Sequence, residues 1–354
     1  MSFRRSKYLL VYLTPLVVGL SLSSSGAWTF LSVVILFGLL PLLELFTKGS
    51  TENLNAAEEE LAKQDRFYDW LLYSLVPVQY GLAVYFLYRI SFEEVSTLEL
   101  TGLTLSLGMS CGVLGINAAH ELGHRHTKQE QAMSKLLLLT SLYMHFFIEH
   151  NRGHHKHVST DEDPASSRYG ETVYAFFIRS IRDSWLSAWQ LEKIRLQKKQ
   201  IPLFSWRNEM LRFQVYQVAF LLLIGFVFGF VSMLLFITAA TIGFLLLEAV
   251  NYIEHYGLRR RKTDSGYERP LPVHSWNSNH PLGRLVLLEL SRHSDHHYMA
   301  SRKYQVLRHF DESPQMPTGY PGMILLALLP PLWFHIMHPK IEHYRHTQEG
   351  YALA

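Results

Sequence analysis

Six long apolar runs constrain this chain of 354 residues more than any other feature. A hydrocarbon core about 30 Å thick is crossed by roughly 20 helical residues, and five of the six runs are close to that length. The first run is shorter, and we interpret it as one arm of a hairpin with the second. We therefore predict an all-α integral membrane protein. The predicted transmembrane helices are residues 8–22, 27–46, 70–90, 98–119, 213–229 and 232–254.

The basic residues indicate the orientation of these helices. The connections 23–26 and 91–97 contain neither Lys nor Arg, whereas basic residues precede the first run, lie in the longer connections and follow the last run as Arg259-Arg260-Arg261-Lys262. The positive-inside rule then predicts that both termini and all the long loops are cytoplasmic. We expect a single domain, 1–354, whose cytoplasmic cap consists mainly of residues 120–212 and 255–354.

Two further apolar runs are too short or too broken to be simple spans. Residues 133–148 suit one helix that is buried against the bundle or lies at the interface. Residues 321–337 contain Pro330-Pro331, which interrupts a helix, so we expect a re-entrant or interfacial segment.

Composition excludes several classes of site. The net charge is only +3, which gives little electrostatic support to a nucleic-acid partner. The single cysteine, Cys111, excludes a disulfide framework, a cysteine-rich zinc site and an iron–sulfur cluster on this chain. We expect Cys111 to be a small buried side chain.

Histidine is frequent, with 19 residues, and none precedes position 120. Four groups stand where the predicted topology brings them to one depth, just inside the cytoplasmic face. They lie at the end of the fourth span, after the short apolar run, at the end of the sixth span and in the C-terminal region. Their members are His120 and His124; His150, His154 and His155; His255; and His293, His296 and His297.

The spacing within these groups suits metal ions. Residues three or four apart share one helix face, so His120/His124, His150/His154 and His293/His297 can each hold one ion. Neighbours such as His155 project about 100° away and can serve a second ion. Nine histidines suit two first-row metals, and imidazole alone does not select among zinc, copper, iron and nickel.

The stretch His120-Glu121-Leu122-Gly123-His124 is, by itself, the zinc-protease signature, with the glutamate as general base. A membrane zinc metalloprotease therefore stays as an alternative, although a protease needs one further ligand and not seven. A histidine-lined metal transporter is a weaker alternative, because its histidines should follow a path across the bilayer.

Carboxylates adjoin most of the proposed ligands. Metal-bound histidines usually donate their other N–H to a carboxylate or a carbonyl group, and we assign that supporting role to five residues. Direct ligation is hardest to exclude for Glu121. The five residues are Glu121, Glu149, Glu254, Asp295 and Asp163.

The motifs "HELGH", "EHNRGHH", "NYIEHYGL" and "LSRHSDHH", in this order, resemble the membrane-bound alkane 1-monooxygenases (alkane omega-hydroxylases). This family lies within the histidine-rich membrane di-iron desaturases and hydroxylases. Further matches are "DPASSRYGE", "HSWNSNH" and "PTGYPG". The resemblance covers nearly the whole chain and implies six transmembrane helices under a cytoplasmic di-iron cap. Its ligand set falls on the same nine histidines.

The resemblance also implies a reaction and its partners. It implies terminal hydroxylation of n-alkanes, taken from the bilayer, to primary alcohols with O2 at two non-haem iron ions. It implies electrons from a separate rubredoxin, reduced by an NAD(P)H-dependent reductase, and a place in the bacterial inner membrane, with the active site cytoplasmic. A hydroxylase or desaturase of another hydrophobic substrate, such as xylene or a fatty acid, is the alternative within redox chemistry.

Overall fold

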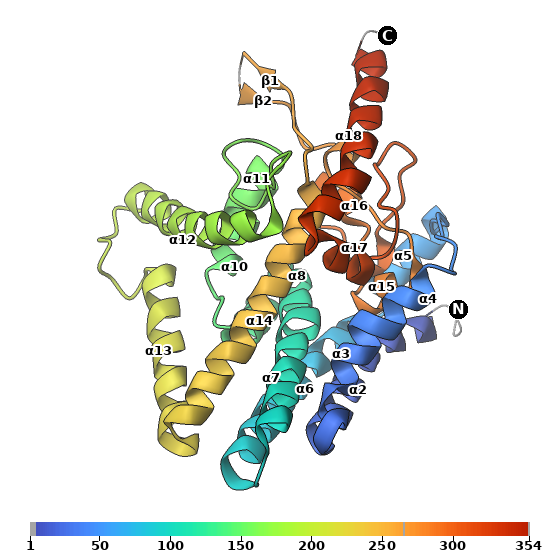
Figure 1. The fold of residues 1–354 in the computed structure, drawn as a ribbon. Helices are drawn as coiled ribbons and strands as arrows, with labels where there is room; N and C mark the ends of the chain where they lie inside the picture. The colour runs from blue at the N-terminus through green and yellow to red at the C-terminus, as the bar shows by residue number, and fades with distance from the viewer. Residues whose placement is uncertain (1–4, 265, 353–354) are drawn as a thin grey trace.

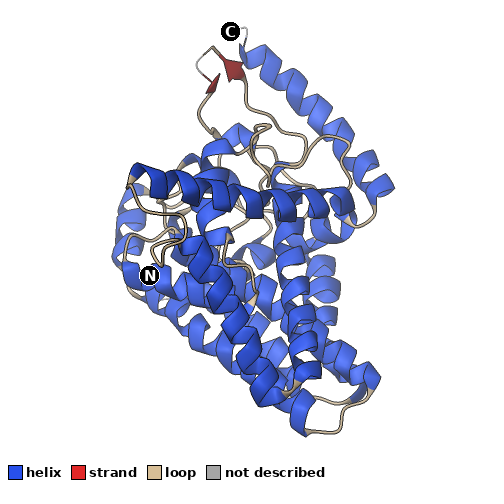
Figure 2. Cartoon of the chain, turned by 90° about the vertical axis from the view of Figure 1, so that its left-hand side faces the viewer, coloured by secondary structure: helices blue, strands red, loops and turns tan. Residues whose placement is uncertain are grey.

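The computed structural model describes residues 5–264 and 266–352, and it describes the backbone but not the side chains of 346–352. Helices dominate the chain (Figure 2). In the described residues the strands form one short antiparallel hairpin, β1 (Lys262–Thr263) with β2 (Gly266–Tyr267). The prediction of an all-α membrane protein agrees with this content.

Five helices are long and apolar enough to cross a membrane, and they coincide with the second to sixth predicted spans (Figure 1). The first of the five, Gly26–Glu44, is built from η2 (Gly26–Phe30), α3 (Leu31–Val34), η3 (Ile35–Leu39) and α4 (Leu40–Glu44). The third, Thr97–Gly123, is built from α7 (Thr97–Met109), η4 (Ser110–Ile116) and α8 (Asn117–Gly123). The others are α6 (Phe67–Phe92), α13 (Glu209–Phe228) and α14 (Phe230–His255).

The first predicted span differs from the other five. Residues Lys7–Ser23 form an apolar helix, η1 (Lys7–Tyr12) followed by α2 (Leu13–Ser23), that falls short of a full span by length. It nevertheless packs beside the spanning helices, with Val18 and Leu22 buried in a core shared with α6 and α7.

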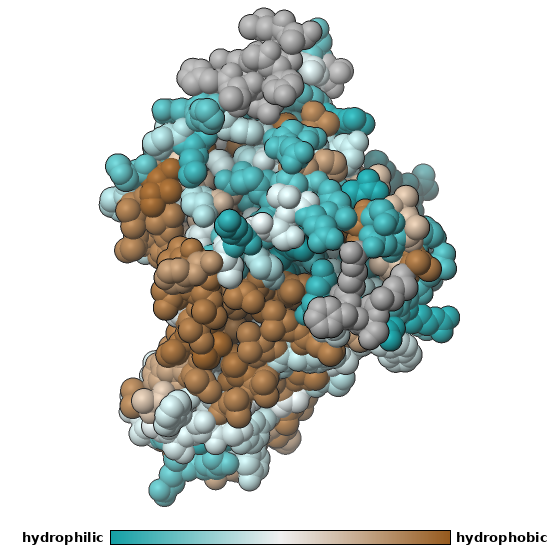
Figure 3. Space-filling model, turned by 90° about the vertical axis from the view of Figure 1, so that its right-hand side faces the viewer, coloured by the Kyte–Doolittle hydropathy of each residue, from teal (hydrophilic) through white to brown (hydrophobic). Residues whose placement is uncertain are grey.

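The surface of the molecule carries a broad apolar belt between two polar ends (Figure 3). Side chains on the spanning helices stand exposed, among them Phe226 and Val231, which are 89% and 67% exposed. Exposed apolar surface on this scale is normal only where lipid or another protein covers it. The belt therefore supports a multi-pass membrane protein.

Glycines let α14 cross the third span at very short range. A Cβ atom added at Gly243 would lie 2.5 Å from the Cβ of Cys111, and one added at Gly112 would lie 2.8 Å from the carbonyl oxygen of Gly243. Small residues permit such close backbone approach between membrane helices. The crossing fixes the relative position of two helices whose ends carry His120 and His255.

The cap above these spans consists of many short helices and two long ones, α12 (Val173–Lys198) and α18 (Pro330–Ala352) (Figure 1). It begins with α9 (Lys128–Thr140), α10 (Phe146–Glu149), η5 (His150–His154), α11 (His155–His157) and α12. It continues after α14 with η6 (Pro272–His274), α15 (Pro281–Val286), α16 (His293–Tyr298), η7 (Tyr304–Val306), α17 (Tyr320–Ala327) and α18. The connection between the first two spans of full length carries α5 (Ala56–Gln64).

The prediction of one helix over residues 133–148 is wrong. The run divides into α9 and α10, and the turn between them holds Leu142 with a left-handed φ of 52°. The amide of Tyr143 bonds back to the carbonyl of Leu138, which closes the end of α9. After this turn α10 begins, and it leads directly to His150.

The proline-containing run 321–337 is not a straight span either. Helices α17 and α18 meet at an angle of 119°, with Pro330 opening α18. Leucines at this corner are exposed, including Leu329 at 56% and Leu332 at 45%. The bend agrees with the predicted re-entrant or interfacial segment.

Candidate metal centre

The nine predicted histidines lie together in two adjacent clusters. Within each cluster one ring nitrogen per residue lies within 4.8 Å of all the others. The first cluster consists of His120, His124, His150, His155 and His296. The second cluster consists of His154, His255, His293 and His297. The rings of His155 and His297 are 4.5 Å apart, so the clusters share a wall.

The local backbone decides which histidine joins which cluster. We expected His150 and His154 to hold one ion because they are four residues apart, and that pairing is wrong. Residues His150–His154 form a π-helical turn, in which the repeat is five residues rather than four. His150 therefore shares a face with His155, and His154 turns to the second cluster.

Ordinary helical geometry explains the other pairs. His120 lies in α8, and His124 follows it one turn later. His293 and His297, four apart in α16, both join the second cluster, while His296 projects into the first.

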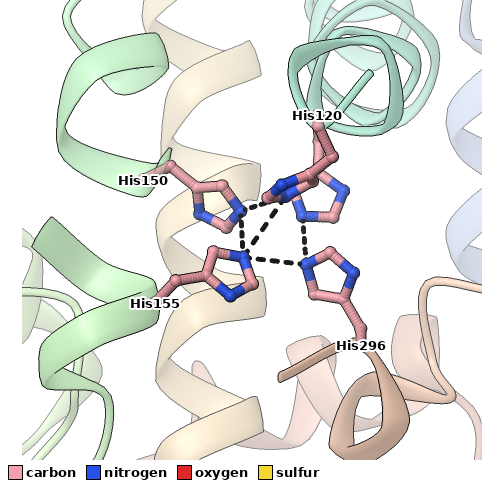
Figure 4. A group of neighbouring side chains, drawn as sticks. His120, His150, His155 and His296 are labelled. Atoms are coloured by element: carbon pink, nitrogen blue, oxygen red, sulfur yellow. Dashed lines mark hydrogen bonds between the residues drawn. The ribbon is translucent and has the colours of Figure 1, made fainter. Parts of the chain in front are cut away.

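The first cluster points its Nε2 atoms at one another from separate segments of the chain (Figure 4). The Nε2 atoms of His124, His150 and His155 form a triangle with sides of 3.0, 3.1 and 3.2 Å. His296 extends it, with its Nε2 3.1 Å from that of His155 and 3.0 Å from that of His120.

Hydrogen bonds alone cannot satisfy this triangle. A neutral imidazole nitrogen is either a donor or an acceptor, so among three mutually contacting nitrogens at least two must be alike. One contact therefore places two lone pairs, or two hydrogens, face to face. A cation at the centre would accept all three lone pairs at once.

The second cluster has the same character. The Nε2 of His293 lies 2.9 Å from that of His297 and 3.2 Å from that of His255. The Nε2 of His154 is buried and has no hydrogen-bond partner among the described residues. A buried polar atom without a partner is costly, and a metal ion at this point would remove that cost.

The distances also fit a metal. Nitrogens that bind an ion at about 2.0–2.1 Å and at right angles lie about 3 Å apart, which is the spacing observed in both clusters. Nitrogen donors of this kind suit zinc, copper, iron or nickel. The geometry alone therefore supports two metal ions without choosing the element.

Burial keeps most of the cluster histidines in the state that binds metals. Burial, together with the neighbouring His154 and Arg125, lowers the pKa of His124 to about 3. Burial and neighbouring histidines also hold several pKa values well below their ordinary range, those of His150, His155, His293, His296 and His297. Imidazole binds a metal when it is neutral, so these rings are ready to act as ligands at neutral pH.

Asp163 contacts His154, one of the proposed ligands. Its Oδ2 lies 2.9 Å from Nδ1 of His154, and both side chains are buried. Burial opposes the charge on His154, but Asp163, together with Glu149 and Glu248, outweighs burial and raises the pKa of this histidine. The contact fixes the ring so that Nε2 faces the second cluster.

Three of the other predicted carboxylates do not touch a cluster histidine through any hydrogen bond described here. Glu121 pairs with Arg125, Asp295 pairs with Arg302 at 2.7 Å, and the carboxylate of Glu149 lies 3.5 Å from Ser187. Consecutive helical residues diverge by about 100°, so adjacency in sequence directs these carboxylates away from the rings.

Glu121 is also unsuited to the role of a protease base. Its carboxylate lies 2.8 Å from Nη2 of Arg125 and accepts a hydrogen bond from the amide of Tyr304. The side chain is buried. A general base needs access to the water that it activates, and here both contacts hold the carboxylate away from such a role.

Glu254 lies on the metal side of the second cluster rather than behind it. Its Oε2 is 3.1 Å from Nε2 of His293, the same nitrogen that faces His255 and His297. Its Oε1 accepts a hydrogen bond from the hydroxyl of Tyr320 at 2.7 Å. Sequence reasoning did not single out Tyr320, although it lies in the quoted motif "PTGYPG".

An apolar cavity leads to both clusters. It is lined by Leu36, Phe37 and Leu40 of the Gly26–Glu44 helix and by His120, His150 and His293 of the two clusters. The rest of the lining is mainly aliphatic, from η4, α14, α17 and the segment that contains α15. Polar groups appear beside the clusters, where Asn117, Asn251, Glu254 and Tyr320 meet the cavity.

Comparison with known proteins gives a consistent picture. The family model for fatty acid desaturases matches residues 97–327. Alkane 1-monooxygenase 1 and alkane 1-monooxygenase 2 of Pseudomonas aeruginosa are 44% and 43% identical to the chain, over 91% and 96% of it and 85% and 91% of their own lengths. The xylene/toluene monooxygenase hydroxylase component of Pseudomonas putida is 29% identical over 78% of the chain and 74% of its own length.

Proposed function

The chain belongs to the alkane 1-monooxygenase family, and on that premise we propose that it hydroxylates the terminal methyl group of n-alkanes with O2. The single observation that carries the proposal is the apolar cavity that ends at two clusters of converging imidazole nitrogens. An alkane has no polar group, so it can bind only by burying its CH2 groups against an apolar wall. Each buried CH2 contributes about 0.8 kcal/mol to the free energy of binding.

The nine histidines are proposed to hold two iron ions, one in each cluster. Iron is chosen for the chemistry, because the geometry suits several metals. When bound, the two ions supply the O2-derived oxidant that breaks an unactivated C–H bond, which no protein acid or base can do. Glu254 stands between the second cluster and the cavity, where it can add an anionic oxygen to the nitrogen donors.

The remaining lining residues position the substrate and exclude water. The aliphatic walls hold the alkane chain, so that its end reaches His120, His150 and His293. Asn117 lines the cavity, and its Nδ2 is buried without a hydrogen-bond partner among the described residues. We propose that this amide donates a hydrogen bond to the hydroxyl group of the primary alcohol. The alcohol needs such a partner, whereas the alkane does not.

The same proposal includes an electron donor and an orientation. Electrons come from a rubredoxin, reduced by an NAD(P)H-dependent reductase, because Cys111 is buried and is the single cysteine of the sequence. The basic connections support a cytoplasmic cap and cytoplasmic termini in a bacterial inner membrane. The cap is then the face that a soluble electron donor reaches.

A reconstituted assay tests the proposal. The purified protein in lipid is given Fe(II), rubredoxin, reductase and NADH, with octane or hexadecane as substrate under ¹⁸O2. We expect 1-alkanol with one labelled oxygen, and iron analysis near two ions per chain. Absence of 1-alkanol with every component present would refute alkane hydroxylation, and about one zinc with no iron would refute the metal assignment.

A methyl group on an aromatic ring is the second candidate substrate. The hydroxylase component of xylene/toluene monooxygenase shares 29% identity with the chain, so m-xylene belongs in the same assay. Turnover of xylene with none of the alkanes would favour this alternative.

A further inference from the structure

A run of aromatic side chains begins at the residue after His255 of the second cluster and ends at the surface of the cap. Tyr256 directly follows His255 and is fully buried. Its ring lies 5.2 Å from those of Tyr252 and Trp333 and is nearly parallel to that of Tyr169 at 6.5 Å. Tyr169 is 39% exposed. Easily oxidised rings therefore run from the residue that follows a cluster histidine to solvent, with ring centroids 5.2 to 6.5 Å apart.

The hydroxyl group of Tyr256 has a proton acceptor. Its oxygen accepts a hydrogen bond from the amide of Gly170 at 2.9 Å and lies 2.9 Å from Nε2 of His338. Because the amide already occupies an acceptor position of the oxygen, the hydroxyl hydrogen points to His338. This histidine is half-buried and stacks against Tyr169 at 4.1 Å.

Tyr169 has a proton acceptor of its own. Its hydroxyl group donates to Oε1 of Glu342 at 3.0 Å, and the guanidinium of Arg345 lies 5.0 Å above its ring. A positive charge on this ring would be opposed by Arg345. Loss of a proton to Glu342 together with the electron avoids that charge.

We propose that Tyr256 and Tyr169 form a relay that carries oxidising equivalents away from the metal centre to the cap surface when no alkane is in the cavity. The proposal rests on the proposed function, because an oxidant strong enough to attack an alkane would otherwise damage the histidines around it. Packing alone does not explain the arrangement, since phenylalanine would fill the same volumes without a hydroxyl group directed at a base.

Each step of the relay balances. The phenol of Tyr256 gives one electron to the O2-derived oxidant, which is reduced by one equivalent, and gives its proton to Nε2 of His338. Tyr169 then gives one electron to the Tyr256 radical and its proton to Glu342, while His338 returns its proton to Tyr256. A soluble reductant, such as the reduced rubredoxin already required for turnover, supplies the electron that restores Tyr169, and Glu342 returns the proton.

The test uses the full-length enzyme with iron, rubredoxin, reductase, NADH and O2, first with octane and then without alkane. Three quantities are measured: the initial rate of 1-octanol formation, the tyrosyl radical signal by electron paramagnetic resonance, and the half-life of activity during turnover without alkane. The variants are Tyr256→Phe, Tyr169→Phe and His338→Gln. The matched control is Tyr73→Phe, because Tyr73 is a part-buried tyrosine of α6 whose hydroxyl group also donates to a carboxylate, that of Glu130.

We expect Tyr256→Phe to keep the initial rate, to lose the radical signal and to shorten the half-life several-fold. His338→Gln should weaken the signal, because the proton acceptor is gone, and Tyr73→Phe should match the wild type. Should Tyr256→Phe fail to fold, the half-exposed Tyr169→Phe carries the test, with the radical trapped at Tyr256. Wild-type radical signal and half-life in both phenylalanine variants, while 1-octanol still forms, would overturn the relay and leave the proposed function intact. Absence of 1-octanol in the wild type would instead refute the proposed function.

Discussion

Replacement of Asp163 by asparagine isolates the contribution of one charge to the second cluster. The carboxylate is buried and lies 2.9 Å from Nδ1 of His154, while its other oxygen accepts the amide of Ala165 at 3.1 Å. Asparagine has nearly the same shape but only one accepting oxygen, so it can keep the contact with His154 or the one with Ala165, and its NH2 group takes the other place. The substitution therefore removes the charge and one acceptor without opening a cavity.

Two independent estimates give the size of the effect. A hydrogen bond to a charged group contributes about 1.5–3 kcal/mol and a neutral one about 0.5–1.5 kcal/mol, a difference of about 1–1.5 kcal/mol. Loss of a residue that supports a metal-binding histidine costs about 10- to 100-fold in metal affinity, and tenfold corresponds to about 1.4 kcal/mol. The estimates overlap near tenfold, which is the expected loss for Asp163→Asn.

Equilibrium dialysis against buffered Fe(II), followed by iron analysis, measures this loss. We expect the ion of the second cluster to need about tenfold more free Fe(II) for half-occupancy. The ion of the first cluster should keep its wild-type affinity, because the hydrogen bond of Asp163 to a histidine is to His154, in the second cluster. Asp161→Asn is the control, because it removes the same charge two residues away, from a side chain that is 79% exposed. Wild-type affinity at both ions in Asp163→Asn would refute the reasoning, and equal weakening of both would show that the substitution acts through the fold.

Four further substitutions, with one control, probe the clusters, the cavity and the helix crossing. His296→Ala and His297→Ala change adjacent residues but should remove ions from different clusters. Each should lower the iron content from about two to about one per chain and abolish alkanol formation. Identical iron spectra for the two variants would contradict the division into two clusters. Leu40→Trp should shorten the longest alkane that the enzyme accepts, measured by the products formed across alkane chain lengths. The control Leu42→Trp changes an exposed residue of the same helix and should have no such effect. Equal product profiles for the two variants would argue against the cavity as the substrate site. Gly243→Ala should destabilise the protein by about 1–3 kcal/mol through overpacking, and an unchanged thermal midpoint in detergent would show that the crossing relaxes.

The parts of the fold that sequence predicts are those set by composition over a long window. The spans from Gly26–Glu44 to Phe230–His255 follow from hydropathy alone, because each must be apolar along its whole length whatever surrounds it. The break between α9 and α10 was missed because its turn contains neither glycine nor proline. Leu142 adopts the left-handed conformation there under the demands of packing, which local sequence does not encode.

The candidate site shows the same division. The nine histidines could be found from their spacing, but their assignment to two clusters depends on a π-helical turn, which one extra residue in the hydrogen-bond ladder creates. Carboxylates were assigned by adjacency in the chain, and adjacency misleads on a helix: Glu121 adjoins His120 yet contacts Arg125 four residues on. Asp163 reaches His154 across nine positions because the chain folds back.

The turn from His150 to His155 has a consequence for how the two proposed metal ions would bind. This one short peptide presents rings to both clusters, so an ion that settles in either cluster immobilises backbone that the other also needs. The second ion then binds a segment whose conformational entropy has already been lost, and binding becomes cooperative without any change of shape. Under iron limitation such a population would divide into empty and fully loaded molecules, with few half-loaded ones that could consume O2 without completing the reaction.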